Sequence, residues 1–114
     1  MQEYEPWYGV DLDATLAEHV PCKFHRRIKA IGKPIPRMVE RIQGLLNEGK
    51  NVKIFTARAV HGVPEKKRIQ LWLMERANLP PLEVTNVKDP GLVELYDDRA
   101  VQVEPNTGKT YVKE

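Results

Sequence analysis

Apolar positions along the chain fall into short runs that alternate with longer amphipathic segments. Residues 7–12, 51–56, 82–86 and 92–96 are apolar runs with the length and composition of strands. Two segments between them repeat apolar residues at helical spacing, one from Pro36 to a stop at Gly49 and one from Pro64 to about residue 78. Strands that alternate with helices predict an α/β fold with a parallel sheet and right-handed crossovers.

The remaining segments are predicted to be connections. The stretch 16–35 contains Pro21, Gly32 and Pro34 and is expected to form a flap-like loop. The tail at 106–112 predicts a turn through Thr107 and Gly108 that leads into an edge strand. Because the chain has 114 residues, we expect residues 1–114 to form a single domain.

Composition and charge exclude some classes of protein but do not indicate a function. Hydrophobic residues make up 41% and charged residues 30%, which is ordinary for a globular domain, and no apolar run is long enough to cross a bilayer. A net charge of +2 is too small for binding nucleic acid by charge alone. The first residues do not resemble a signal peptide, and Cys22 is the only cysteine, so we expect a cytoplasmic protein that does not associate with membranes.

Polar side chains stand at or just past the ends of the predicted strands. They are Asp11, Asp13, Thr56, Lys88, Asp97 and Asp98. In parallel sheets the carboxyl ends of the strands meet at one edge, and ligands bind there. We therefore expect these side chains to converge on one site.

These motifs resemble those of the haloacid dehalogenase superfamily of phosphatases. An apolar strand leads into Asp11-Leu12-Asp13-Ala14-Thr15, a second ends at Thr56, Lys88 follows, and a last strand ends in Asp97-Asp98. The resemblance implies a three-layer Rossmann-like parallel sheet flanked by helices. The gaps between Thr15 and Pro36 and between Thr56 and Lys88 are too short for a cap domain, so it implies a small capless member.

The resemblance also implies roles for individual residues. Asp11 would be the nucleophile that forms an aspartyl phosphate, and Asp13 would act as general acid and base. Mg²⁺ would be bound by Asp11, by Asp13 through its backbone carbonyl, and by Asp97 or Asp98, with the choice between the last two left open. The expected phosphate-binding residues are Thr15, Thr56, Arg58 and Lys88.

Several alternatives stay open at the level of sequence. Lys53, Lys66 or Lys67 could replace Lys88, Thr56 could be a helix cap, and Arg58 and Arg99 could be solvated arginines. The stretches Thr-Ala-Arg and Asp-Asp-Arg also resemble some polynucleotide end phosphatases. A catalytically silent binding module is the alternative from another class, although the intact pair Asp11 and Asp13 favours catalysis.

The flap-like loop carries two further candidate features. His19, Cys22 and His25 supply three of the four ligands that a structural zinc site needs. Basic residues could form a rim for a bulky phosphorylated substrate such as a nucleic-acid end, unless those contacts come from a neighbouring subunit of a homo-oligomer. The basic residues are Lys23, Arg26, Arg27 and Lys29, together with Lys66, Lys67 and Arg68.

Overall fold

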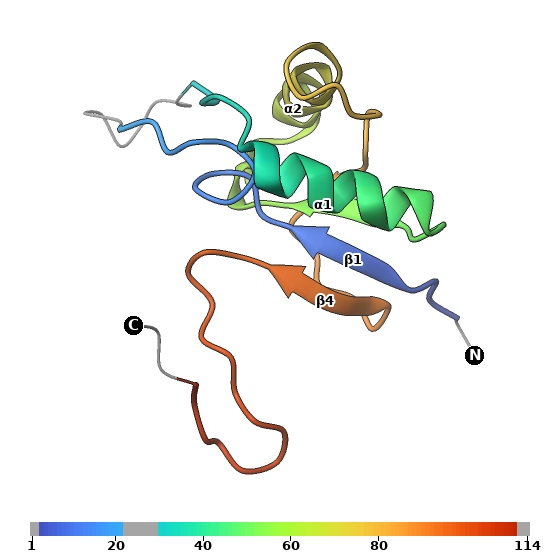
Figure 1. Cartoon of the computed structure of the whole chain (residues 1–114), viewed down its shortest axis with the longest axis vertical. Helices are drawn as coiled ribbons and strands as arrows, with labels where there is room; N and C mark the ends of the chain where they lie inside the picture. The colour runs from blue at the N-terminus through green and yellow to red at the C-terminus, as the bar shows by residue number, and fades with distance from the viewer. Residues whose placement is uncertain (1–2, 22–29, 112–114) are drawn as a thin grey trace.

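The computed structural model describes residues 3–21 and 30–111 of the chain. This part of the protein has four strands; helices separate the first three, and the fourth follows the third without a helix between them (Figure 1). The elements are β1 (Trp7–Val10), α1 (Pro36–Asn47), β2 (Val52–Phe55), the 3₁₀ helix η1 (Ala57–His61), α2 (Val63–Glu75), β3 (Val84–Thr85) and β4 (Leu92–Tyr96). The four strands and two helices predicted between residues 7 and 96 are therefore present, with strand ends that differ by one to two residues except at β4, which agrees fully.

The four strands form one parallel sheet in the order β3-β2-β1-β4. Strand β1 is central, since Val10 pairs with Ile54 of β2 on one side and with Tyr96 of β4 on the other. The predicted α/β fold with a parallel sheet is confirmed. The pairing also brings together the ends of β1 and β4, which lie far apart in the sequence.

Both α-helices pack into one apolar core. Ile42 of α1 and Ile69 and Leu73 of α2 are fully buried in the same cluster as Val10 and Ile54 of the sheet. In Figure 1, α1 lies across the strands and α2 is seen almost end-on above it. The chain moves from β1 to β2 to β3 in one direction across the sheet. Right-handed crossovers in one direction place both helices on the same face of the sheet, so the helices share one core.

The other face of the sheet is covered in a different way. The ring of Trp7 is 1% exposed, lies 6.2 Å from the ring of Phe55, and donates from Nε1 to Asp89 at 2.8 Å. Asp89 belongs to the short connection that runs from the end of β3 to the beginning of β4. A second layer of α-helix, which the expected three-layer arrangement needs, is not found among residues 3–21 and 30–111. This connection is too short for one.

Local sequence explains where the helices begin and end. Proline occupies the first turn of both α-helices, where a missing N–H costs nothing. Gly49 has φ of 79° and ends α1 as predicted, because this left-handed backbone is strained for other residues. The second helix ends at Glu75, before the predicted residue 78, and Asn78 itself has φ of 55°. Neither α-helix is long and apolar enough to cross a bilayer, within the part of the chain that is described.

The ends of the flap-like loop are fixed to the domain and to each other. Glu18 N donates to Lys33 O at 2.8 Å, and Ile35 N donates to Leu16 O at 2.7 Å. Trp72 of α2 donates from Nε1 to Gly32 O at 3.1 Å. A Cβ atom at Gly32 would overlap the carbonyl oxygen of Glu18, so this close approach requires glycine. Residues 22–29 of the loop lie outside the described residues.

The tail after β4 folds on itself. Val103 and Thr110 form an antiparallel bridge, and Glu104 N donates to Lys109 O at 2.8 Å. The predicted turn is present, with Asn106 and Gly108 at positive φ. The predicted edge strand is not found in the described part of the tail, because Thr110 pairs with Val103 rather than with the sheet.

Candidate active site

Three carboxylates meet where the central strand and its neighbour end. Asp11 directly follows β1, and Asp97 and Asp98 directly follow β4. The backbone joins the two strand ends, since Asp11 N donates to Tyr96 O at 2.9 Å. Carboxylate oxygens of the three residues lie within 4.8 Å of one another. We call Asp11, Asp97 and Asp98 the acidic cluster; their predicted convergence is present in the structure.

A tight loop after Asp11 supports this cluster. The carbonyl of Leu12 accepts hydrogen bonds from the N–H groups of Thr15, Leu16 and Ala17, and Ala14 has φ of 67°. The turn directs the hydroxyl of Thr15 at Asp98: Oγ1 donates to Asp98 Oδ1 at 3.1 Å and accepts from Asp98 N at 3.1 Å. Thr15 therefore orients an acidic residue of the cluster. Its predicted contact with phosphate stays a prediction.

Asp11 has an unusual protonation equilibrium. Burial raises the pKa of its carboxyl from 3.8 to about 7, and the nearby Asp97 and Asp98 add to the shift, while a backbone hydrogen bond from Leu12 opposes it. Like charges close together in a partly buried place disfavour ionisation. A divalent cation would remove that repulsion, and a cluster of carboxylate oxygens matches the preference of Mg²⁺ for oxygen ligands. The residues present thus fit a hard cation.

The raised pKa of Asp11 has a consequence for stability. The pKa of Asp11 is about 7 in the folded protein and 3.8 ordinarily. The contribution of protonated Asp11 to the free energy of unfolding is therefore complete below about pH 4 and is lost as the pH rises through 7. The carboxyl is only partly buried, so solvent screens part of this effect, and we expect Asp11→Asn to raise the unfolding free energy more at pH 8 than at pH 5.5. Urea unfolding with chelator at pH 5.5 and pH 8 measures it. An equal effect of the substitution at both pH values would contradict the assigned cause.

Asp13 points to a different partner from the acidic cluster. Arg58 Nε donates to Asp13 Oδ2 and Arg58 Nη2 donates to Asp13 Oδ1, both at 2.8 Å. Such a two-pronged contact matches the planar guanidinium to the planar carboxylate. Among the described residues, the side chain of Asp13 does not belong to the acidic cluster, and the expected approach of its backbone carbonyl to a metal stays a prediction.

Glu65 completes a buried ion-pair network. Its side chain is 1% exposed; Oε2 accepts from Arg58 Nη1 at 3.0 Å, and Oε1 accepts from Arg68 Nη1 at 3.0 Å. Arg58, which is only 7% exposed, also donates to the carbonyl of Ala30 at the end of the flap-like loop. We call Asp13, Arg58, Glu65 and Arg68 the ion-pair network. Burial among oppositely charged groups excludes the alternative that Arg58 is a solvated arginine.

Two other predicted phosphate-binding residues have contacts of a different kind. Thr56 is 3% exposed, and its Oγ1 accepts from Arg58 N at 3.2 Å as the cap of η1, which was the alternative interpretation. Lys88 is exposed and precedes Asp89, whose carboxylate binds Trp7 at the beginning of β1, opposite to Asp11. Among the described contacts, none joins Lys88 to the acidic cluster. The phosphate-binding roles of Thr56 and Lys88 stay predictions.

Sequence reasoning missed Glu65 and Arg41. Glu65 stands in the first turn of α2, where an acidic residue is usually explained by the helix dipole and by solvent. The guanidinium of Arg41 on α1 lies 5.4 Å from the ring centre of Tyr96, the residue before the acidic cluster. The spacing of Glu65 and Arg68 was a visible signal for a pair, but nothing in the sequence indicates its burial.

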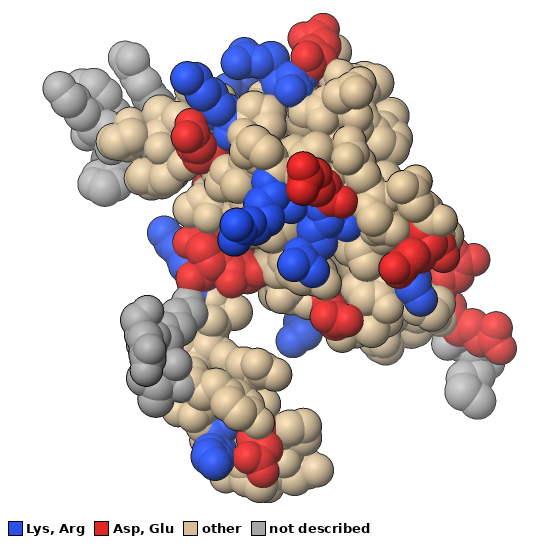
Figure 2. All heavy atoms as spheres, viewed as in Figure 1, with Lys and Arg blue, Asp and Glu red and all other residues tan. Residues whose placement is uncertain are grey.

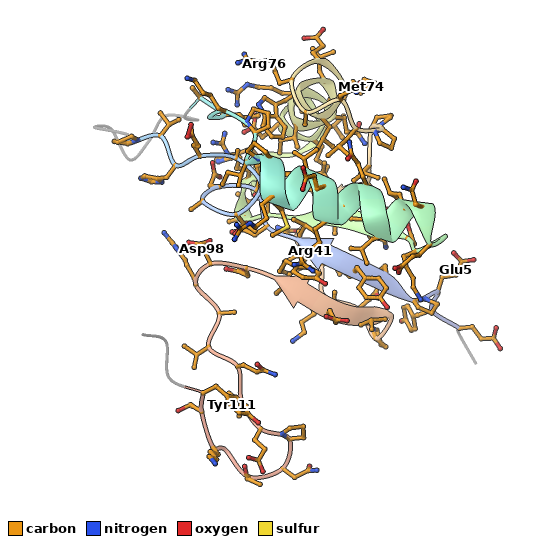
Figure 3. The ribbon with its side chains drawn as sticks, viewed as in Figure 1. Glu5, Arg41, Met74, Arg76, Asp98 and Tyr111 are labelled. Atoms are coloured by element: carbon orange, nitrogen blue, oxygen red, sulfur yellow. The ribbon has the colours of Figure 1, made fainter. Side chains whose placement is uncertain are left out.

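The surface around the acidic cluster carries both signs of charge. Figure 3 labels Asp98 at the bend after β4, and Figure 2 shows acidic side chains gathered at that bend with basic side chains beside them. Of the expected basic rim, Lys23, Arg26, Arg27 and Lys29 lie outside the described residues. Of the zinc candidates, Cys22 and His25 also lie outside them, and His19 is exposed.

Comparisons with protein-family models, with curated proteins and with solved structures found no match to this chain.

Proposed function

We propose that this protein is a Mg²⁺-dependent phosphatase of the haloacid dehalogenase type that acts through an aspartyl phosphate on Asp11. The observation that carries the proposal is the acidic cluster at the carboxyl ends of the adjacent parallel strands β1 and β4. The resemblance of the strand-end motifs to that superfamily supports the same interpretation. The short connections between elements suit a capless member.

The first half of the reaction transfers the phosphoryl group to the protein. A carboxylate oxygen of Asp11 attacks phosphorus, a new bond from that oxygen to phosphorus forms, and the bond to the leaving oxygen breaks. Asp13 gives its proton to the leaving oxygen, so that an alcohol departs rather than an alkoxide. Mg²⁺ bound by Asp11, Asp97 or Asp98 and the Asp13 carbonyl would neutralise the phosphate charge that otherwise repels Asp11.

The second half regenerates the protein. Asp13, now ionised, takes a proton from water, and the water oxygen bonds to phosphorus as the bond from phosphorus to Asp11 breaks. Inorganic phosphate leaves, and Asp13 again holds a proton. Thr15 orients Asp98 throughout by the hydrogen bonds between their side chains and backbone.

A substrate screen tests the proposal. The purified full chain is assayed for phosphate release from p-nitrophenyl phosphate, sugar phosphates, nucleotides and 3′-phosphorylated oligonucleotides, with Mg²⁺ or with chelator. We expect release that requires Mg²⁺ and is lost with chelator. No release from any substrate would contradict the phosphatase and favour a silent binding module; release that persists in chelator would contradict the metal.

A further inference from the structure

The carboxylate of Asp13 makes contacts that its proposed role in proton transfer does not by itself explain. Arg58 contacts both of its oxygens at 2.8 Å, and the two residues lie 45 positions apart in the chain. The loop that carries Asp13 contains Ala14 in a left-handed conformation. Because Arg58 contacts both oxygens, it constrains the orientation of the carboxylate.

Arg58 is in turn fixed from three other directions. Its backbone N–H donates to the hydroxyl of Thr56, and its Nη2 donates to the carbonyl of Ala30 at 3.0 Å. Its Nη1 donates to Glu65 Oε2 at 3.0 Å. These contacts hold the guanidinium of Arg58 in one orientation. Because the guanidinium is planar and binds both oxygens of Asp13, it also fixes the plane of that carboxylate.

Glu65 helps to fix the guanidinium of Arg58. A carboxylate that is 2% exposed is costly to bury without cationic partners, and here Arg58 and Arg68 supply them. No described contact joins Glu65 to Asp13 or to the acidic cluster. In the described contacts, Glu65 is connected to Asp13 through Arg58.

We propose that Arg58, anchored by the buried Glu65, is a positioning residue that orients the carboxylate of Asp13 for its proton transfers. The inference rests on the proposed phosphatase function and extends it to two residues outside the acidic cluster. A proton donor works only within hydrogen-bond reach of the atom that it protonates, so a freely rotating Asp13 would seldom be in place. Protonation matters most when the leaving group is a poor one.

The test compares two leaving groups in Arg58→Lys and Glu65→Gln. The p-nitrophenolate of p-nitrophenyl phosphate leaves readily without a proton, whereas the alkoxide of glycerol phosphate needs one. We expect kcat/KM to fall at least about tenfold further for glycerol phosphate than for p-nitrophenyl phosphate in both variants. The control is Arg76→Lys, an exposed arginine at the end of α2, for which we expect the ratio of the two substrates to stay at the wild-type value.

Equal losses for both substrates would overturn the positioning role and leave the phosphatase standing. A wild-type protein that releases phosphate from neither substrate, nor from any other substrate of the screen, would instead overturn the phosphatase, and the positioning role with it. If Arg58→Lys does not fold, Glu65→Gln, which keeps the shape of the side chain, decides the question. A further loss from Glu65→Gln in an Asp13→Asn background would also contradict the proposal, because the effect must vanish once Asp13 is gone.

Discussion

Replacement of Asp11 by asparagine is expected to reduce phosphate-ester hydrolysis by at least about 1000-fold, as losses of a reacting group commonly do. The amide matches the carboxylate in size but cannot form the acyl phosphate bond. The fold should persist, because the substitution removes a carboxyl group whose ionisation the fold disfavours. Burial and neighbouring acids raise the pKa of this carboxyl to about 7. Release of p-nitrophenol and thermal unfolding, measured on the same preparation, check both parts.

Glu94→Gln is the matched control for this substitution. Glu94 lies on β4, is exposed, and loses a charge in the same way without belonging to the acidic cluster. We expect wild-type turnover from this control. Turnover of Asp11→Asn within threefold of wild type would remove Asp11 as the nucleophile, and an unfolded Asp11→Asn protein would contradict the account of its pKa.

Loss of metal binding is the second large effect that we expect. Asp97→Asn or Asp98→Asn should weaken Mg²⁺ binding by about tenfold or more, because a hard cation loses a charged oxygen ligand. Calorimetric titration of MgCl₂ into each variant measures the change and shows which residue is the direct ligand. Unchanged affinity in both variants would contradict a metal site formed by the acidic cluster.

Asp97 and Asp98 have different hydrogen-bond partners, and this difference helps to identify the direct metal ligand. Asp97 Oδ1 accepts from the backbone N–H of Arg99 at 2.7 Å, whereas Asp98 Oδ1 accepts from Thr15 Oγ1 at 3.1 Å. If Asp98 is the direct ligand, Thr15→Val should weaken binding as well, by about tenfold for a partner that orients a ligand. If Asp97 is, Thr15→Val should leave the affinity close to wild type.

The acidic cluster was predictable from the sequence, and the reason is geometric. Asp11, Asp97 and Asp98 each follow an apolar run, and parallel strands bring such positions to one edge regardless of their separation in the chain. Periodicity also predicted α1 and α2, since Ile42, Ile69 and Leu73 recur on faces that the structure buries. These features depend on local pattern and on one topological rule.

The ion-pair network was not predictable, because it depends on which distant side chain meets which. Glu65 looks like an ordinary acidic residue near a helix start, and the sequence does not show that Arg58 approaches it from η1 and, with Arg68, offsets the cost of its burial. The surroundings of Lys88 were not predictable for a related reason. The strand β3 ends at Thr85, and the short connection to β4 then leads away from the carboxyl edge, with Asp89 bound to Trp7.

The parallel pairing of β1 with β4 also has a consequence for the order of events during synthesis. Strand β1 leaves the ribosome well before its partner on one side, which ends at Tyr96. Contacts between segments so distant in sequence form slowly, because a long loop must close before they contribute. The nascent chain must therefore keep this edge of β1 unpaired until β4 has been made. Asp11 is synthesised long before Asp97 and Asp98, yet it meets them only after β4 has paired with β1.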